Sequence, residues 1–344
     1  MKGVLLERSP EGVRFLRMAV SALPQDLQPP ERAQAIRSVV QSLRDDHEVR
    51  IVTAVSGSNA VLRSVLFPRM SPQELKAALA FEAEKYIPFK LDETYLDFFI
   101  VGNRPAGRME VLLAAARNDL VDSHVEMLQS AGITPSAVDL EPLALSNALE
   151  LSHPLKKAAS AGPRKRPAKG QAGAEGEGKE MAGTGEVVAL LHVGARATIL
   201  VALMDSCFEF SRESSIGGAA FSRAVAQGLR LDGTQAEELK LHPDSRGAEV
   251  RSLLQPVWES WVVQCRASLD FYENQFGHKV QRFMISGGSA RLSGFKEWLQ
   301  ETLGLPTEEW DPAAALKSEV DPQQLESHRP VLAVAVGLAV RELL

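Results

Sequence analysis

The sequence predicts an α/β protein with two similar lobes, a cleft between them and a small α+β module inserted into the first lobe. Residues 1–57 and residues 187–289 each contain, in the same order, a hairpin, a helix and a strand that ends in a Ser-Gly turn. The repeated order indicates an internally duplicated domain, in which a ligand would lie between the halves. Residues 58–116 have no counterpart in the second half, so we expect them to form the insertion.

The first lobe is predicted from residues 1–57 and 117–152. Residues 1–22 place apolar runs on either side of a turn at 9–12, which is typical of a hairpin. Residues 31–43 have apolar side chains at helical spacing, and residues 50–55 form a strand-rich run before Ser56 and Gly57. A helix at 119–131 and a strand at 136–140 complete the prediction for this lobe.

The insertion, residues 58–116, is predicted to contain strands at 60–67, 94–101 and 109–115 and a helix at 71–86. The helix has Ser71 as its N-cap, Pro72 at its first position and Glu74 at its third, a combination that favours a helix start. An insertion in one half of a duplicated domain more often makes contacts than chemistry, so we expect a binding module.

Residues 153–186 separate the two halves. They are rich in Lys, Ala, Gly, Pro and Glu and have almost no large apolar side chain, so they cannot offset the entropy cost of ordering. We expect a disordered linker. Its basic positions at 156–157 and 164–166 could contact an anionic membrane or a partner, although a solvated tether is the preferred interpretation.

The second lobe is predicted from residues 187–344. Three short strands between residues 187 and 212 are followed by helices at 219–229 and 252–274 and by a strand at 283–285. The long helix has a core face, and the last strand ends in the turn at 286–289.

Bulk properties exclude several classes of protein. The 344 residues have a formal net charge of −6 and two cysteines, Cys207 and Cys265. This charge gives no general affinity for nucleic acid or acidic lipid, and so few cysteines are typical of a reducing cytoplasm. The longest apolar run, at 331–340, is shorter than the roughly 20 residues that span a bilayer. We expect a cytoplasmic protein that reaches a membrane only through a partner and binds no nucleic acid.

Several stretches together resemble the PilM family of actin-like type IV pilus assembly proteins, relatives of the division protein FtsA. The resemblance covers nearly the whole chain except the linker, and its order and spacing are more specific than any single stretch. The matching stretches are 66–71 (LFPRMS), 81–89 (FEAEKYIPF), 96–98 (LDF), 131–133 (AGI), 138–145 (VDLEPLAL), 216–218 (IGG), 236–240 (AEELK), 266–272 (RASLDFY) and 286–294 (SGGSARLSG).

The resemblance implies an actin-like, duplicated ribonuclease H-like fold with residues 58–116 as the extra (1C-like) subdomain. It also implies ATP in the cleft, with two hairpins that hold the phosphates through backbone N–H groups and acidic residues that act through Mg²⁺. The adenosine would be held by a Glu-x-x-Lys helix and a Gly-Gly turn.

The adenosine side of this pattern is retained. Glu237 and Lys240 lie three residues apart and so share a helical face. The glycines and serine expected near the nucleotide are Gly217, Gly218, Gly287, Gly288 and Ser289. The alternative is that Glu237 and Lys240 form an exposed ion pair and that the glycines only turn the chain.

The phosphate side matches less well. In the first hairpin Glu7 keeps a carboxylate and Arg14 a cation near Gly12, but Pro10 removes a backbone donor. In the second hairpin Gly194 keeps the turn, while His192 stands where the family has an aspartate. Because neutral imidazole cannot replace a carboxylate around hydrated Mg²⁺, the resemblance leaves ATP possible and magnesium doubtful.

His192 could also be a catalytic base or a metal ligand. The other histidines show no ligand spacing with it, and there is no Ser or Cys nucleophile motif. A hydrogen-bonded structural histidine on a buried strand is the preferred interpretation.

Three functional hypotheses follow. The first is a pilus scaffold with weakened or lost hydrolysis, which the resemblance implies would bind the cytoplasmic tail of a PilN-like inner-membrane protein between the insertion and its lobe. The residues expected to contact the tail are Pro68, Arg69, Met70, Tyr86, Ile87, Pro88 and Phe89. The second is a working ATPase that uses Glu7. The third, a filament-forming division protein of the FtsA type, is disfavoured because no tethered amphipathic helix is predicted at residues 341–344. Self-association of the protein stays open.

Overall fold

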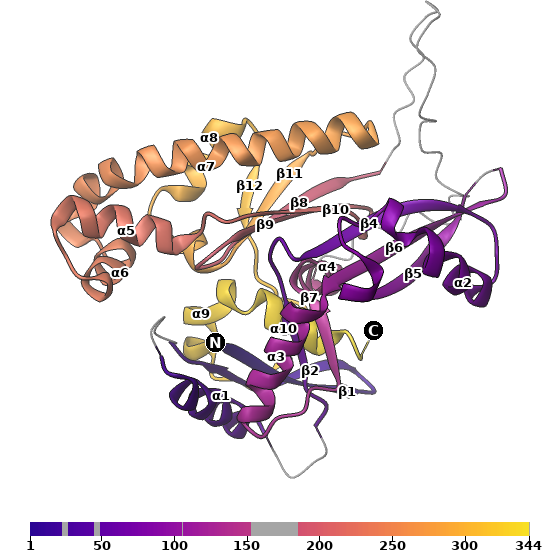
Figure 1. The fold of residues 1–344 in the computed structure, drawn as a ribbon. Coiled ribbons are helices and arrows are strands. Elements are labelled where there is room, and N and C mark those ends of the chain that lie inside the picture. Colours follow the sequence, from indigo (N-terminus) through magenta and orange to yellow (C-terminus); the bar gives the residue numbers. More distant parts are fainter. Residues whose placement is uncertain (23–26, 45–48, 105, 153–184, 344) are drawn as a thin grey trace, which may run out of the picture.

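The computed structural model describes residues 1–22, 27–44, 49–104, 106–152 and 185–343 and consists of two lobes with a protruding insertion (Figure 1). The predicted linker at 153–186 lies outside the described residues except for its last two. The hairpin predicted at the start is present as β1 (Lys2–Ser9) and β2 (Gly12–Val20), which pair antiparallel. A parallel pair, β3 (Val52–Val55) and β7 (Ala137–Leu140), lies with it, together with α1 (Pro29–Leu43), α3 (Asn118–Ser130) and α4 (Glu141–Ser152).

The second lobe is built on a five-stranded sheet in the order β10-β9-β8-β11-β12. Its strands are β8 (Val187–Val193), β9 (Thr198–Met204), β10 (Cys207–Ser214), β11 (Arg282–Ser286) and β12 (Thr307–Glu309). Its helices are α5 (Gly218–Leu229), α6 (Gly233–Leu241), α7 (Gly247–Phe276) and α8 (Phe295–Leu303).

Both faces of β8 and β9 are buried, which explains why these strands read as continuous apolar runs. Alternate residues of β8 point to opposite faces. Ala189 and Leu191 pack in one core with Trp258 and Trp261 of α7. Leu190 packs in a second core with α4 and with helix α10 (Ala333–Val340), so the sheet of the second lobe packs directly on helices that belong to the other half of the molecule.

The insertion is a three-stranded antiparallel sheet in the order β4-β6-β5, covered on one face by α2. The elements are β4 (Ala60–Pro68), α2 (Pro72–Glu82), β5 (Thr94–Arg104) and β6 (Arg108–Arg117). The predicted cap is present: the Ser71 N–H donates to the Glu74 carboxylate at 2.7 Å, and Ser71 Oγ accepts from the Glu74 N–H at 3.3 Å. The helix ends at Glu82 and continues as one 3₁₀ turn, a few residues earlier than the sequence predicts.

After β12 the chain returns to the first hairpin. β13 (Lys317–Ser318) pairs with β2, α9 (Pro322–His328) follows, and α10 (Ala333–Val340) packs on α4 and β1. These residues fall within the range 187–344 that the sequence assigns to the second lobe, but they contact elements of the first. Short 3₁₀ turns occur at Ala83–Lys85, Leu91–Glu93, Asp244–Arg246, Gly288–Arg291 and Arg329–Val331.

The apolar run at 331–340 is therefore a core helix. Gly337 lies where α10 crosses α4, and a Cβ atom at this position would be 1.7 Å from the carbonyl oxygen of Ala144. The two helix backbones touch, which only glycine permits. Across the described ranges, every helix falls short of the length or the apolar character that a membrane crossing demands.

Candidate functional site

Three turns of the second lobe meet at the edge of its sheet. The turn between β8 and β9 is closed by the Gly194 N–H, which donates to the Ala197 carbonyl at 2.9 Å. The start of α5 packs against this turn, because the N–H groups of Gly218 and Ala219 donate to the carbonyls of Gly194 and Ala195 at 2.8 and 2.7 Å. The first donors of α5, which would be available to an anion at a free helix start, are thus used by the hairpin itself.

The glycines predicted for this site allow the turns to approach one another. A Cβ atom at Gly217 would be 2.6 Å from the Gly194 carbonyl oxygen, and one at Gly218 would be 2.9 Å from Ser289 Oγ. Gly287 has φ +92°, and a Cβ there would be 2.2 Å from the Val193 carbonyl oxygen. Gly288 is less crowded, since its nearest neighbour would be Val331 Cγ1 at 4.0 Å. The structure brings these predicted residues together, and all but Gly288 are required by protein packing.

Glu237 and Lys240 lie on α6 beside the same turns. The buried Lys240 Nζ donates to Glu237 Oε2 at 2.7 Å, to Ser222 Oγ at 2.9 Å and to the Gly218 carbonyl at 3.3 Å. Half of the Glu237 side chain remains exposed, at 49%. The ion pair therefore has a buried lysine and a half-exposed glutamate, instead of two exposed side chains. Glu237 can still accept hydrogen bonds from a ribose, whereas all three protons of Lys240 have acceptors.

His192 lies at the end of β8 with its ring buried. Its Nδ1 is 2.9 Å from Ser286 Oγ on the neighbouring strand β11. Burial lowers the pKa of His192 to about 3, and the positive charge of Lys2 adds to the effect. The imidazole is therefore neutral at physiological pH and has the hydrogen-bonded structural role preferred from the sequence. In the part of the chain that is described, no three His, Cys, Asp or Glu side chains are grouped to hold a metal ion.

The residues predicted for the first phosphate hairpin lie apart from this cluster in an exposed ion-pair network. Arg14 Nη1 is 3.0 Å from Glu7 Oε2, and Arg14 also pairs with Glu319 next to β13. Gly12 has φ +120° in the turn, which is further fixed by Lys317 pairing with Glu11 at 2.6 Å. The carboxylate and the cation that the sequence assigns to nucleotide chemistry thus neutralise each other.

The opposite end of the first hairpin faces the second lobe. Lys2 lies near His192 and Glu141, and desolvation lowers the pKa of Lys2 while the Glu141 charge opposes this. The pKa of Glu141 is raised by burial and by the charge of Glu213, and Ser56 partly offsets this with a hydrogen bond. Glu213 on β10 accepts the Gly57 N–H at 2.8 Å, and burial raises its pKa as well.

Lys2, Ser56, Gly57, Glu141 and Glu213 form what we call the interlobe cluster. It ties the Ser-Gly turn after β3 to strand β10 of the second lobe. Sequence reasoning missed its charged members. Glu141 belongs to a stretch that carried the family resemblance, but no local pattern marks Lys2 or Glu213, because they meet only through the packing of the two lobes.

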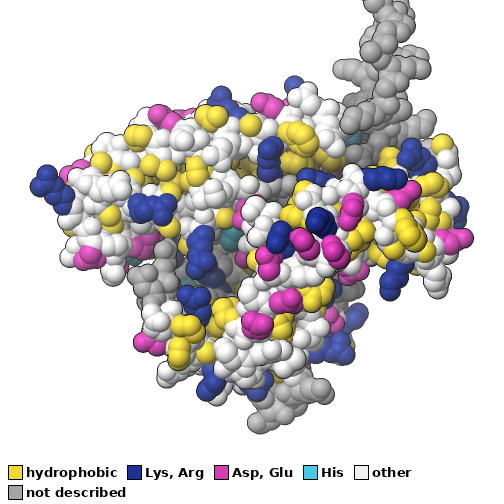
Figure 2. All heavy atoms as spheres, in the orientation of Figure 1, with side chains coloured by type: hydrophobic (Ala, Val, Ile, Leu, Met, Phe, Trp, Pro, Cys, Tyr) yellow, Lys and Arg dark blue, Asp and Glu magenta, His cyan; other side chains and the backbone are white. Residues whose placement is uncertain are grey.

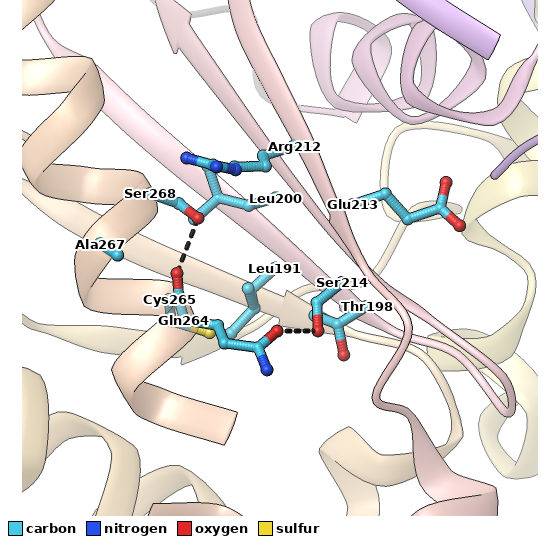
Figure 3. Close-up of a pocket in the computed structure, with 10 residues that line it drawn as sticks. All are labelled: Leu191, Thr198, Leu200, Arg212, Glu213, Ser214, Gln264, Cys265, Ala267 and Ser268. Carbon is cyan, nitrogen blue, oxygen red and sulfur yellow. Dashed lines mark hydrogen bonds between the residues drawn. The ribbon is translucent and has the colours of Figure 1, made fainter. Parts of the chain in front are cut away.

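A cavity of about 250 Å³ lies between the sheet and α7 next to this cluster (Figure 3). Ser214 Oγ donates to Gln264 Oε1 at 2.7 Å on its rim, and the Glu213 carboxylate points away from the other labelled side chains. Cys265 lines the cavity, but burial raises the pKa of its thiol to about 12, so it is no nucleophile at neutral pH.

The predicted partner-binding residues are unequally accessible. Ile87 is buried, Pro68, Arg69 and Pro88 are exposed, and the remaining three, Met70, Tyr86 and Phe89, are half-buried. The most exposed aromatic side chains of the insertion are others: Phe81 at 86%, Phe99 at 68% and Tyr95 at 53%. Figure 2 shows apolar side chains at the surface in the region of the insertion.

Comparison with known proteins is consistent with this architecture. A solved structure described as the "PilM-PilN type IV pilus biogenesis complex" superimposes with a TM-score of 0.80 and 27% sequence identity, covering 99% of this chain and 94% of that one. The two-lobed α/β arrangement is thus the actin-like fold predicted from the sequence.

Two more distant structures are the ethanolamine utilization protein EutJ from Carboxydothermus hydrogenoformans and MreB 5 of Spiroplasma citri bound to AMPPNP. EutJ has a TM-score of 0.48 and 14% identity, over 95% of this chain and 79% of its own. MreB 5 has a TM-score of 0.42 and 12% identity, over 66% of this chain and 65% of its own.

The family model described as "Type IV pilus assembly protein PilM" matches residues 1–161 and 179–343. It spans both lobes and the insertion and omits part of the segment between them. The chain therefore belongs to the PilM family of type IV pilus assembly proteins.

Proposed function

We propose that the protein is a scaffold of the type IV pilus assembly complex that binds the cytoplasmic tail of a PilN-like inner-membrane protein. The observation that carries this proposal is the similarity, over almost the full length of both chains, to a PilM solved in complex with PilN. In this proposal the protein is cytoplasmic and is held at the inner membrane by its partner.

The insertion offers a surface suited to a peptide tail. Tyr95 and Phe99 lie on the face of β5 away from α2, and the Tyr95 hydroxyl donates to Asp122 of α3 at 2.9 Å. Phe99 continues this face beyond the contact with the first lobe. Because β5 is also an edge strand, an extended tail could add to it and cover the ring of Phe99. We propose that the tail also contacts the predicted residues around Pro68, Arg69 and Pro88, with Ile87 supporting them from the core.

Replacing Phe99 by alanine is expected to weaken binding of a synthetic PilN-tail peptide about tenfold or more, because truncation of a central aromatic contact typically costs about 1 to 2 kcal/mol or more. Fluorescence anisotropy with the labelled peptide measures the change. Phe81→Ala is the matched control, since Phe81 is an exposed phenylalanine of α2 on the other side of the insertion, and it is expected to change affinity less than about twofold. Equal affinities of wild-type protein and F99A would contradict this binding surface, and weakening by F81A alone would move the contact to α2.

We further propose that ATP, if held, is held through its adenosine and is hydrolysed slowly or not at all. Support comes from the neutral, buried His192 in place of the family's aspartate and from the ion pair between Glu7 and Arg14. Glu237, with its half-exposed carboxylate, and Gly288 are the residues proposed to contact the nucleoside. Magnesium has no proposed ligand on the second hairpin.

Calorimetry with ATP is expected to give the same dissociation constant, within about twofold, with Mg²⁺ and with a chelator, because neutral His192 stands where the family has a carboxylate and Glu7 is paired with Arg14. Glu237→Gln is expected to weaken any binding, whereas Glu7→Ala is expected to leave it unchanged. A metal-dependent affinity together with ATP hydrolysis that is lost in E7A would overturn this proposal and favour the working ATPase.

The working ATPase remains the second candidate because the interlobe cluster brings two carboxylates, Glu141 and Glu213, close to each other, with Lys2 near Glu141. Neither carboxylate was predicted as a nucleotide-site residue, and in this alternative they act in place of the missing aspartate. Hydrolysis that depends on Glu141 or Glu213, but not on Glu7, would identify this variant of the enzyme.

A further inference from the structure

The edge strands of two different sheets meet at the junction of the insertion and the lobes. β4 is an edge of the insertion sheet, and β10 is an edge of the second-lobe sheet. They contact each other, and a cavity of about 380 Å³ lies between them and is also lined by the Ser-Gly turn at 56–57 and by Leu140. This volume is within the range of small-molecule sites.

Two arginines give the cavity a positive wall. Arg63 comes from β4 and Arg212 from β10, and both are exposed. Within the described ranges, neither guanidinium has a carboxylate within ion-pair distance. Glu213 also lines the cavity, and its carboxylate accepts the Gly57 N–H instead of pairing with either arginine. The two cations are therefore available to an anion.

An aromatic pair gives the cavity a flat apolar wall. The rings of Phe210 and Phe271 are 5.6 Å apart at an angle of 34°. Phe271 is 47% exposed, although it is large and apolar, and the Arg212 guanidinium lies 5.8 Å from its ring centroid. This contact holds Arg212 at the mouth of the cavity. A ligand ring placed on Phe271 would bring its acidic group to the arginine.

We propose that this junction is a binding site for a small anion with a flat apolar body, such as an aryl phosphate or aryl carboxylate. The two arginines recognise the charge, and Phe210 and Phe271 recognise the ring. The site is separate from the glycine-lined turns around Gly218, since the described residues that line the cavity include none from those turns. An occupant would contact the insertion and both lobes at once, and so would fix the insertion relative to the second lobe.

Saturation-transfer NMR on the full-length protein tests this proposal with phenyl phosphate, benzoate and inorganic phosphate as probes. Phenyl phosphate is expected to bind more tightly than inorganic phosphate, as judged by competition, because it uses both walls. The double variant R63Q/R212Q and the variant F271A are each expected to reduce the affinity for phenyl phosphate at least about fivefold, which corresponds to about 1 kcal/mol. Benzoate that competes equally well would identify the site as one for any flat anion rather than for phosphates.

Arg223→Gln is the matched control, because Arg223 is an exposed arginine of α5 that does not line the cavity. Circular dichroism establishes that each variant is folded, and Arg212→Lys, which keeps the charge, provides a second and milder test with a smaller expected loss. Equal affinities of the wild-type protein, R63Q/R212Q and F271A would overturn the proposal. A loss in R223Q as large as in R63Q/R212Q would do the same, since it would show general attraction to positive charge.

Discussion

Replacement of Gly337 by alanine is expected to lower the free energy of unfolding by about 3 kcal/mol or more, because overpacking that displaces backbone is among the most costly single substitutions. The added methyl group would be 1.7 Å from the Ala144 carbonyl oxygen and 2.4 Å from its carbon, both of which belong to the backbone of α4. A flexible side chain could move aside, but a helix backbone cannot do so without separating α10 from α4. Urea unfolding followed by tryptophan fluorescence measures the loss.

Gly233→Ala is the matched control for this substitution. Gly233 is the first residue of α6, has no atom within 4 Å of the place that the added methyl group would take and has no positive φ. Alanine is expected to be tolerated there, because it has the higher helix propensity. Equal urea midpoints for the Gly337 and Gly233 variants would mean that α10 and α4 are not in backbone contact in solution.

Replacement of His192 by glutamine is expected to make the protein less sensitive to acid. The folded-state pKa of His192, about 3, lies below its ordinary value of 6.5, so above pH 6.5 the group contributes no pH dependence. As the pH falls below 6.5, the unfolded chain takes up a proton that the folded protein does not. Stability is then lost at about 1.4 kcal/mol per pH unit until the folded pKa is reached. At about pH 4.5 the wild-type protein should have lost about 3 kcal/mol through this residue alone.

The measurement compares the unfolding free energies of wild-type protein and H192Q at about pH 7 and about pH 4.5. Glutamine does not titrate, and its amide can still bond to Ser286. The pKa values of Glu141 and Glu213 are raised in the folded protein, so their titration increases the free energy of unfolding as the pH falls. This contribution is common to both proteins and cancels in the difference between them. Parallel pH profiles of the two proteins would show that His192 takes up its proton over the same pH range in the folded protein as in the unfolded chain. That result would be incompatible with the burial of its ring.

The strands and helices that can be predicted from the sequence are those specified by residues close to one another along the chain. β1 and β2 flank one short turn, and α2 has its cap residues in the expected order, so local chemistry is sufficient. The sequence does not predict α4, because apolar side chains surround it: it packs between the two lobes and lacks the polar face that gives a helical period. α10 has the same property, which is why its sequence reads as a short membrane-like run.

The candidate site likewise has contacts that the sequence predicts and contacts that it does not. Glu237 and Lys240 are three residues apart on one helix, so their contact follows from helix geometry. The predicted glycines meet because each ends a recognisable strand. The interlobe cluster could not be predicted, since it joins residues more than 150 positions apart, such as Gly57 and Glu213, through the relative placement of the lobes. Whether a guanidinium such as Arg212 has an acidic partner also depends on that placement, and spacing along the chain does not reveal it.

The return of α10 to α4 also has a consequence for the order in which the protein folds. Gly337 and Ala144 are almost 200 residues apart, and Lys317 of β13 similarly pairs with Arg14 of β2. During synthesis the first hairpin and α4 are made well before the helix that covers them. Closing such a long loop slows folding. Strands β8, β9 and β10 of the second lobe pair with their neighbours along the chain and can form before then, so the lobe that is translated first is expected to be completed last.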